Sequence, residues 1–146
     1  MDEHKKTIIQ KRMERTAEAL KANGMEAVCV ASKKEALERV AQYLPEGALV
    51  ACGGSMSLEE CGVMTLLRTG PYEFLDRNAP GTTPDKVEEI FRLAFCADVY
   101  FTSSNAITEQ PAQKNVDGNC NRVAAMLFGT KTVLEVAGYN QSLKHI

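Results

Sequence analysis

The feature that most constrains the fold is an alternation of amphipathic helical segments with short, continuously apolar runs. Apolar runs occupy residues 27–31, 48–52, 99–102 and 132–137, and a shorter candidate strand occupies residues 72–75. Short continuous apolar strands are typical of a parallel sheet that helices cover on both faces. We therefore predict an α/β fold, a three-layer sandwich with a mostly parallel sheet of about five strands.

The segments between the runs carry helical spacing and helix-end signals. Apolar positions recur at spacings of three and four over residues 5–23. Ser32 with Glu35, and Ser57 with Glu60, have the spacing of capping boxes and predict two further helix starts. Pro84 at a first helical position predicts a fourth helix, and residues 123–128 predict one or two helical turns.

Length and composition restrict the class of protein. A chain of 146 residues suits one domain, so we predict a single domain over residues 1–146. The net charge of −2 argues against a general nucleic-acid or membrane-surface binder, which needs a basic excess. No apolar run approaches the ~20 residues of a membrane span. The charged N-terminus has no signal-peptide core, and we expect a cytoplasmic protein.

Cysteine and histidine usage gives no metal or redox signature. The five cysteines are odd in number and none shows C-x-x-C spacing, so we expect no disulfide framework and no metal site. His4 and His145 lie near the chain ends, which disfavours Ser-His-Asp and Cys-His mechanisms. We expect no cofactor on this chain.

Three polar segments follow predicted strands, at the edge where parallel sheets bind ligands. They are Gly53–Ser57, Thr102–Glu109 and Asn115–Arg122. A glycine turn that enters a helix lets backbone N–H groups approach a phosphate or carboxylate. The candidate ligand-binding residues are Gly53, Gly54, Ser55, Ser57, Ser103, Ser104, Asn105, Thr108, Asp117, Asn119, Asn121 and Arg122. The competing interpretation is a tight capped turn followed by solvated loops.

Three residues within these segments carry further hypotheses. Glu109 is the candidate nucleophile or general base, provided that the pocket desolvates it. Arg122 lies in the first turn of a predicted helix, an unfavourable place for a cation. We therefore expect it to have a partner, which is Asp117, Glu109 or a bound anion. Cys120 would be a reactive thiol if Arg122 lowered its pKa, and structural inertness is the alternative.

The blocks CGGSMSLEECGV, ADVYFTSSNAITE, NVDGNCNRVAAMLFG and VLEVAGYN appear in this order over roughly residues 50–140. Together they resemble the signature blocks of the lactate-utilization (LUD) domain family. The resemblance implies a fold related to sugar-phosphate isomerases and CoA transferases. It also implies an accessory role in the oxidation of L-lactate to pyruvate, beside iron–sulfur or flavin-type partner proteins. The expected ligand is a small anionic metabolite, and a homo-oligomer is an open alternative to a monomer.

An isomerase-like or CoA-transferase-like enzyme that acts on a small phosphorylated or carboxylated metabolite is the alternative function, and whether the chain is an enzyme stays open. Three departures from the family pattern bear on the site. Residues 110–113 replace an acid–glycine pair, and Cys120 stands where glycine is common. The cysteine-rich tail of many stand-alone members is missing after Ile146, which leaves a short member or a truncated chain as the alternatives.

Overall fold

A four-stranded parallel sheet organises most of the chain. The computed structural model describes residues 2–110 and 112–139. The strands β1 (Leu49–Cys52), β2 (Glu73–Phe74), β3 (Val99–Thr102) and β6 (Thr132–Glu135) pair in the order β2-β1-β3-β6, all parallel. The α/β prediction with a mostly parallel sheet is confirmed, with four strands in this sheet.

Six α-helices and one 3-10 helix lie in the described residues. They are α1 (Glu3–Ala22), α2 (Lys33–Ala41), α3 (Met56–Glu60), α4 (Val63–Thr69), α5 (Pro84–Leu93), η1 (Ala94–Cys96) and α6 (Asn121–Leu127). Among these helices, none combines the length and the apolar character that a membrane crossing needs.

Internal contacts divide the chain into two units. Unit 1 contains Met1–Ala31, Ser104–Asn115 and Ala137–Ile146, and unit 2 contains Ser32–Ser103 and Val116–Val136. The sheet therefore belongs to unit 2. This division into contact units does not test the prediction of a single domain, which stays a prediction.

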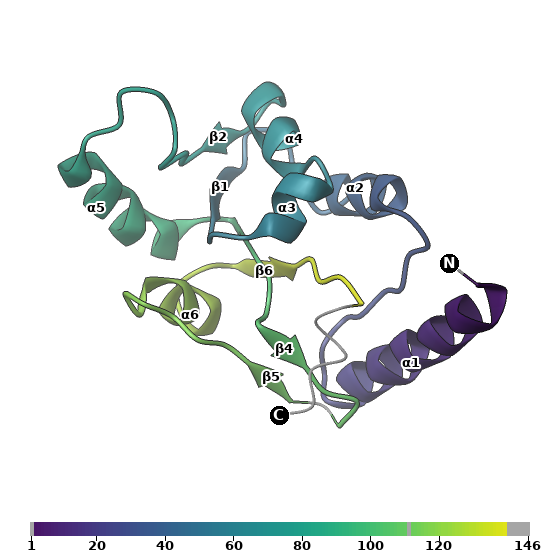
Figure 1. Ribbon diagram of the computed structural model, residues 1–146. Coiled ribbons are helices and arrows are strands. Elements are labelled where there is room, and N and C mark those ends of the chain that lie inside the picture. The colour runs from purple at the N-terminus through teal and green to yellow at the C-terminus, as the bar shows by residue number, and fades with distance from the viewer. Residues whose placement is uncertain (1, 111, 140–146) are drawn as a thin grey trace. The chain divides into compact units, whose positions relative to one another are not determined.

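One face of the sheet in unit 2 carries the larger core. The register places Val50 beside Val99 and Cys52 beside Phe101, so these alternate residues share a face. Buried residues of α2, α3 and α4 pack on that face, including the fully buried Leu58. Figure 1 shows these three helices together on one side of β1.

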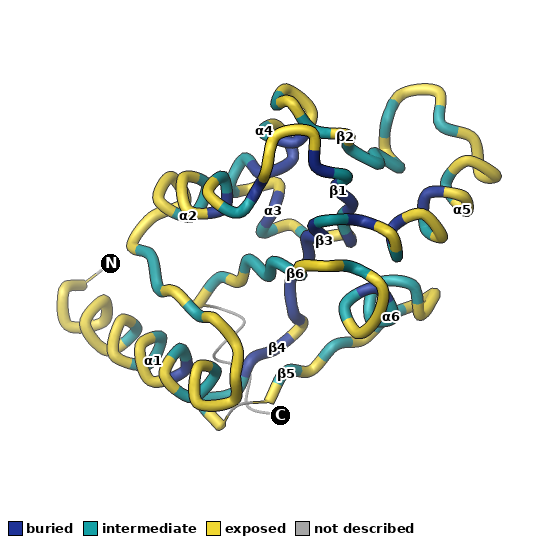
Figure 2. Tube along the Cα trace, turned by 180° about the vertical axis from the view of Figure 1, so that it is seen from behind, coloured by how far each residue is buried: buried dark blue, intermediate teal, exposed yellow. Residues whose placement is uncertain are grey.

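The opposite face carries small residues. Ala51 and Tyr100 pair in the register and pack with Ala94, Ala97 and Ala125 of η1, its following turn and α6. Small side chains let these elements approach the strands closely. Figure 2 shows that burial in unit 2 concentrates on β1 and β3, whereas much of α5 and α6 is exposed. Helices on both faces make unit 2 a three-layer arrangement.

Unit 1 joins α1 to a short antiparallel hairpin. The strands β4 (Ala106–Ile107) and β5 (Gln113–Lys114) pair with each other, and both residues of β4 are buried. Arg12 of α1 donates from Nε to Oε1 of Glu109 at 2.7 Å. The long polar stretch after β3 was expected to be loop, so the hairpin was missed.

Two local sequence predictions were wrong. Residues 27–31 form no strand, and Val28 in the middle of the run is 48% exposed. The third helix begins at Met56, two residues earlier than a cap at Ser57 would give, because Ser55 is the N-cap and its Oγ accepts from the N–H of Leu58 at 3.3 Å. That helix also breaks at Gly62, whose φ of 79° starts α4.

Candidate functional site

The glycine turn after β1 lies at the carboxyl end of the sheet in unit 2. The N–H of Gly53 donates to the carbonyl of Phe101 in β3 at 2.8 Å, which holds the turn against the neighbouring strand. Gly53 is buried, whereas Gly54 is exposed and can meet a ligand. Ser55 and Ser57 begin α3, which has only five residues. A helix this short has little macrodipole, so a ligand site here depends on the side chains around the turn.

Arg122 packs its aliphatic stem on this turn. A Cβ placed on Gly53 would lie 2.9 Å from Cδ of Arg122 and 3.2 Å from the hydroxyl of Tyr100. Glycine is therefore the residue that lets both side chains approach. The guanidinium of Arg122 donates from Nη1 to the carbonyl of Ser103 and from Nη2 to the carbonyl of Val116, the latter at 2.9 Å. Backbone carbonyls were not among the partners expected for Arg122.

Two groups beneath the turn keep their protons at neutral pH. Burial, together with the nearby Cys52, raises the pKa of Tyr100 to about 12 against the opposing influence of Arg77 and Arg122. Burial also raises the pKa of Cys52 to about 11, against the influence of Arg77. The phenol of Tyr100 and the thiol of Cys52 are thus both neutral beside the glycine turn. The positive charge of Arg77 acts to lower the pKa of each.

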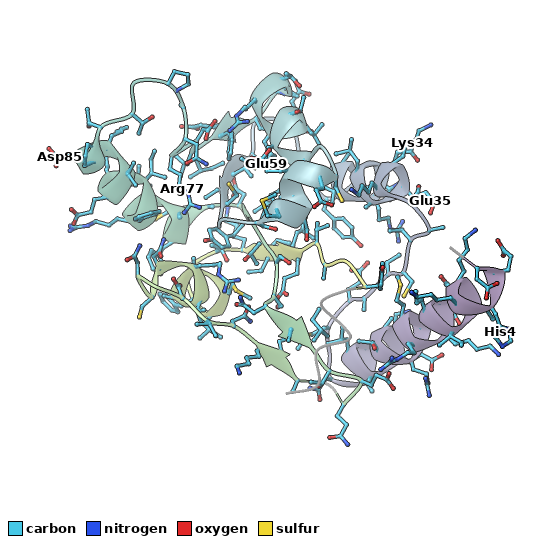
Figure 3. The ribbon with its side chains drawn as sticks, viewed as in Figure 1. His4, Lys34, Glu35, Glu59, Arg77 and Asp85 are labelled. Atoms are coloured by element: carbon cyan, nitrogen blue, oxygen red, sulfur yellow. The ribbon has the colours of Figure 1, made fainter. Side chains whose placement is uncertain are left out.

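Arg77 faces a hollow beside the glycine turn. The hollow has a volume of about 400 Å³. Its lining residues are Cys52, Gly53, Gly54, Ser55, Met56, Glu59, Met64, Arg77 and Asn78. A Cβ placed on Gly54 would lie 3.0 Å from Nη2 of Arg77, and the guanidinium lies 5.5 Å from the ring centroid of Phe91. Figure 3 shows Arg77 between α5 and β1.

The remaining wall of the hollow is sulfur-rich and carries one acid. Sγ of Cys52 donates to Sδ of Met64 at 3.8 Å, and Met56 lines the mouth with 74% of its surface exposed. Glu59 on α3 contributes a carboxylate to the same lining. Within the described residues, no group of three histidine, cysteine or acidic side chains could hold a metal ion. The chemistry on offer is an arginine beside an apolar wall, which suits an anion with an apolar portion.

The loop before α6 is organised by Asp117. Its Oδ1 accepts from the N–H of Asn119 at 3.2 Å and its Oδ2 from the N–H of Val123 at 3.0 Å. Burial acts to raise the pKa of Asp117, but these backbone hydrogen bonds and Arg122 lower it below its usual value. Asp117 therefore satisfies an N–H group in the first turn of α6, whereas Cys120, not Asn119, occupies the N-cap position.

Cys120 and Asn121 complete this loop. Cys120 precedes α6 with φ of 59°, the left-handed conformation that glycine adopts more readily. It is the one non-glycine residue in the described chain with positive φ. A glycine at this position would adopt the same conformation without that cost. Asn121 is the first residue of α6.

Four predicted site residues belong to unit 1. Ser104 is buried, and the N–H of Asn105 donates to the carbonyl of Lys114 at 3.1 Å. The N–H of Thr108 donates to the carbonyl of Ala112 at 3.0 Å. Glu109 pairs with Arg12, and its side chain is 35% exposed. A carboxylate held in an ion pair lacks the desolvated setting that the catalytic hypothesis requires, and its catalytic role stays a prediction.

A second hollow of about 340 Å³ lies at the other end of the strands, where β1, β3 and β6 begin. Asp98 and Lys131 line it and form a salt bridge, and Oδ2 of Asp98 also accepts from the N–H of Leu49 at 2.9 Å. The charged groups of Asp98 and Lys131 thus bond to each other and to the backbone where β1, β3 and β6 begin. The hollow beside Gly54 is therefore the better ligand candidate.

Arg77 and Tyr100 were missed by sequence reasoning. Arg77 lies in the loop after β2, which a Pro-Gly signal marks as a turn without indicating a ligand. The usable signal was its position directly after a candidate strand, at the same sheet edge as the glycine turn. Tyr100 lies inside a buried strand, where a core role is the ordinary reading.

The comparisons with known proteins agree with the fold. The model of the LUD domain family matches residues 13–145 of the chain. A search of curated proteins and a search of solved structures each found no match. The family match spans nearly the whole chain and includes both the glycine turn and the loop before α6. This chain belongs to the lactate-utilization (LUD) domain family.

Proposed function

We propose that unit 2 binds a small anionic metabolite in the hollow beside the glycine turn, and that the protein is an accessory component of L-lactate oxidation to pyruvate. The observation that carries the binding proposal is the position of Arg77. Its Nη2 lies close to the open face of Gly54, in a hollow whose other walls are largely uncharged.

The setting of Arg77 favours anion recognition. The guanidinium stacks near Phe91, which orients its planar fork. Arg77 is in none of the salt bridges among the described residues, and the neighbouring carboxylate of Asp76 pairs with Arg68 instead. An arginine fork binds carboxylate or phosphate through two parallel hydrogen bonds. The absence of a side chain on Gly54 gives the anion room to reach that fork.

The accessory role follows from family membership together with the chemistry of the hollow. The hollow offers binding groups, and Cys52 in its lining keeps its thiol protonated at neutral pH because burial raises its pKa to about 11. Such a protein would work beside iron–sulfur or flavin-type redox partners and hold no cofactor itself. No observation specifically favours the isomerase-like or CoA-transferase-like alternative.

The binding proposal is tested by calorimetric titration with sodium lactate, sodium pyruvate and inorganic phosphate. Arg77→Gln should lower affinity by roughly ten- to hundred-fold, since a hydrogen bond to a charged group contributes about 1.5–3 kcal/mol. Arg92→Gln removes an exposed arginine from α5 and is the matched control, which should bind as the wild type does. Equal affinities of wild type and Arg77→Gln would overturn the proposal.

The accessory role has a separate test. The isolated chain should not oxidise lactate with an artificial electron acceptor. Adding the iron–sulfur and flavin-type partners should allow oxidation, and omitting this chain should reduce it. Turnover by the isolated chain would contradict the accessory role and support an enzyme.

A further inference from the structure

The chain leaves and re-enters unit 2 at two points that lie next to Arg122. Unit 2 ends at Ser103 before segment 104–115, and it resumes at Val116. Segment 104–115 contains β4 and β5, which pair as a hairpin in unit 1. The attachment of this hairpin to unit 2 thus runs through Ser103 on one side and Val116 on the other.

One side chain holds both attachment points. Arg122 donates to the carbonyl of Ser103 through Nη1 and to the carbonyl of Val116 through Nη2. We propose that Arg122 is a latch, a positioning residue that fastens the two stems of segment 104–115 together. The latch does not depend on whether an anion binds beside Arg77.

The surroundings of Arg122 direct its fork toward the two carbonyls. Asp117 accepts hydrogen bonds from the N–H groups of Asn119 and Val123, which fixes the loop and the first turn from which Arg122 projects. Gly53 closes the other side, because any Cβ there would lie within 3.0 Å of both Cδ and Cγ of Arg122. The side chain therefore lies along the glycine turn with its fork directed at the stems.

Only arginine suits this role. Two carbonyls on separate chain segments require two N–H donors held at a fixed spacing, which the planar guanidinium supplies. A lysine ammonium is a point donor on a flexible stem, and it would keep the charge while losing one of the two bonds. The β4–β5 pairing continues outward from the latch, since the N–H of Asn105 donates to the carbonyl of Lys114. Opening the latch should let the hairpin fray from its stems.

Hydrogen–deuterium exchange with mass spectrometry tests the latch on the full chain. The deciding quantity is the exchange rate over residues 105–114 divided by the rate over the peptide that contains β1. In Arg122→Lys this ratio should rise about tenfold, the factor that about 1.4 kcal/mol of lost local stabilisation gives. A change in global stability alone speeds exchange in β1 at least as much as in the hairpin, so general destabilisation cannot by itself raise this ratio.

A second variant approaches the latch from the glycine side. Gly53→Ala places a methyl group against Cδ and Cγ of Arg122, so it should raise the ratio in the same direction. Gly118→Ala is the matched control, because its new methyl group would meet nothing within 4 Å. A raised ratio in both variants and an unchanged ratio in the control would support the latch. An unchanged ratio in Arg122→Lys would overturn it.

Discussion

The open face of Gly54 gives a prediction in which stability and binding change in opposite directions. In Gly54→Ala the new Cβ lies 3.0 Å from Nη2 of Arg77, the far end of a flexible side chain that can move by a few tenths of an ångström. The backbone at Gly54 is outside the left-handed region, so alanine fits without strain. A compatible glycine-to-alanine change stabilises a protein by about 0.4–1 kcal/mol, chiefly because the unfolded chain loses freedom.

The same methyl group occupies the position through which an anion would reach Arg77. Displacing the guanidinium or excluding the ligand removes about one charged hydrogen bond, which corresponds to about 1.5–3 kcal/mol. We therefore expect Gly54→Ala to unfold at a slightly higher urea concentration and to bind its best anion roughly ten- to hundred-fold more weakly. Urea unfolding followed by circular dichroism gives the first quantity, and calorimetric titration gives the second.

Gly118→Ala separates the two effects. Its methyl group meets no neighbour, so it should give a similar gain in stability with no change in affinity. Anion binding to Gly54→Ala at wild-type affinity would show that the ligand does not approach Arg77 across this glycine. The proposed approach of the anion to Arg77 would then be wrong.

Three further outcomes follow from the packing and the ionisable groups. Leu58→Ala should lower the free energy of unfolding by about 2–5 kcal/mol in urea titration, because Leu58 is fully buried under the sheet. The hydrogen bond from Lys131, with that from a backbone N–H, holds the pKa of Asp98 below its ordinary value of 3.8. The free energy of unfolding should therefore decrease as the pH is lowered from 3.8 through that depressed pKa, and Asp98→Asn should lose less stability over the same pH range. Burial raises the pKa of Cys52 to about 11, so iodoacetamide should modify Cys52 at least about tenfold more slowly than the exposed Cys120, as measured by peptide mass spectrometry. Equal rates for the two cysteines would contradict the raised pKa of Cys52 and its partly buried position.

Three strands of unit 2 could be predicted because each coincides with a short apolar run, and β1 and β3 are also largely buried. Continuous apolar runs at residues 48–52, 99–102 and 132–137 match β1, β3 and β6. The same rule failed at residues 27–31, because a run becomes a strand only where another strand offers its backbone groups. That segment lies in unit 1 and pairs with no strand in the described chain. The apolar composition of a segment indicates that it tends to be buried, whereas its pairing with another strand depends on the rest of the fold.

The cap of α6 shows a similar limit at the level of one helix end. By residue type Asn119 is a good N-cap candidate, and it lies two residues before the start of α6. Asp117 takes the role instead, because Cys120 in a left-handed conformation turns the chain and brings the N–H of Val123 to the carboxylate. The backbone conformation of one residue thus selects the capping residue. A sequence gives the candidates for a cap, and the torsion angles between them and the helix decide which one is used.

Arg77 and Arg122, the two arginines at the glycine turn, differ in how far their roles could be predicted. The prediction for Arg122 was that a cation in the first turn of a helix must have a partner, and the structure supplies backbone carbonyls in that role. Arg77 had no such signal, since a loop arginine is ordinarily solvated. It faces the hollow because β2 pairs with β1 in parallel, and that pairing brings the loop after β2 to the same edge as Gly54. The position of Arg77 at the hollow therefore depends on strand order, which residue type and spacing alone do not predict.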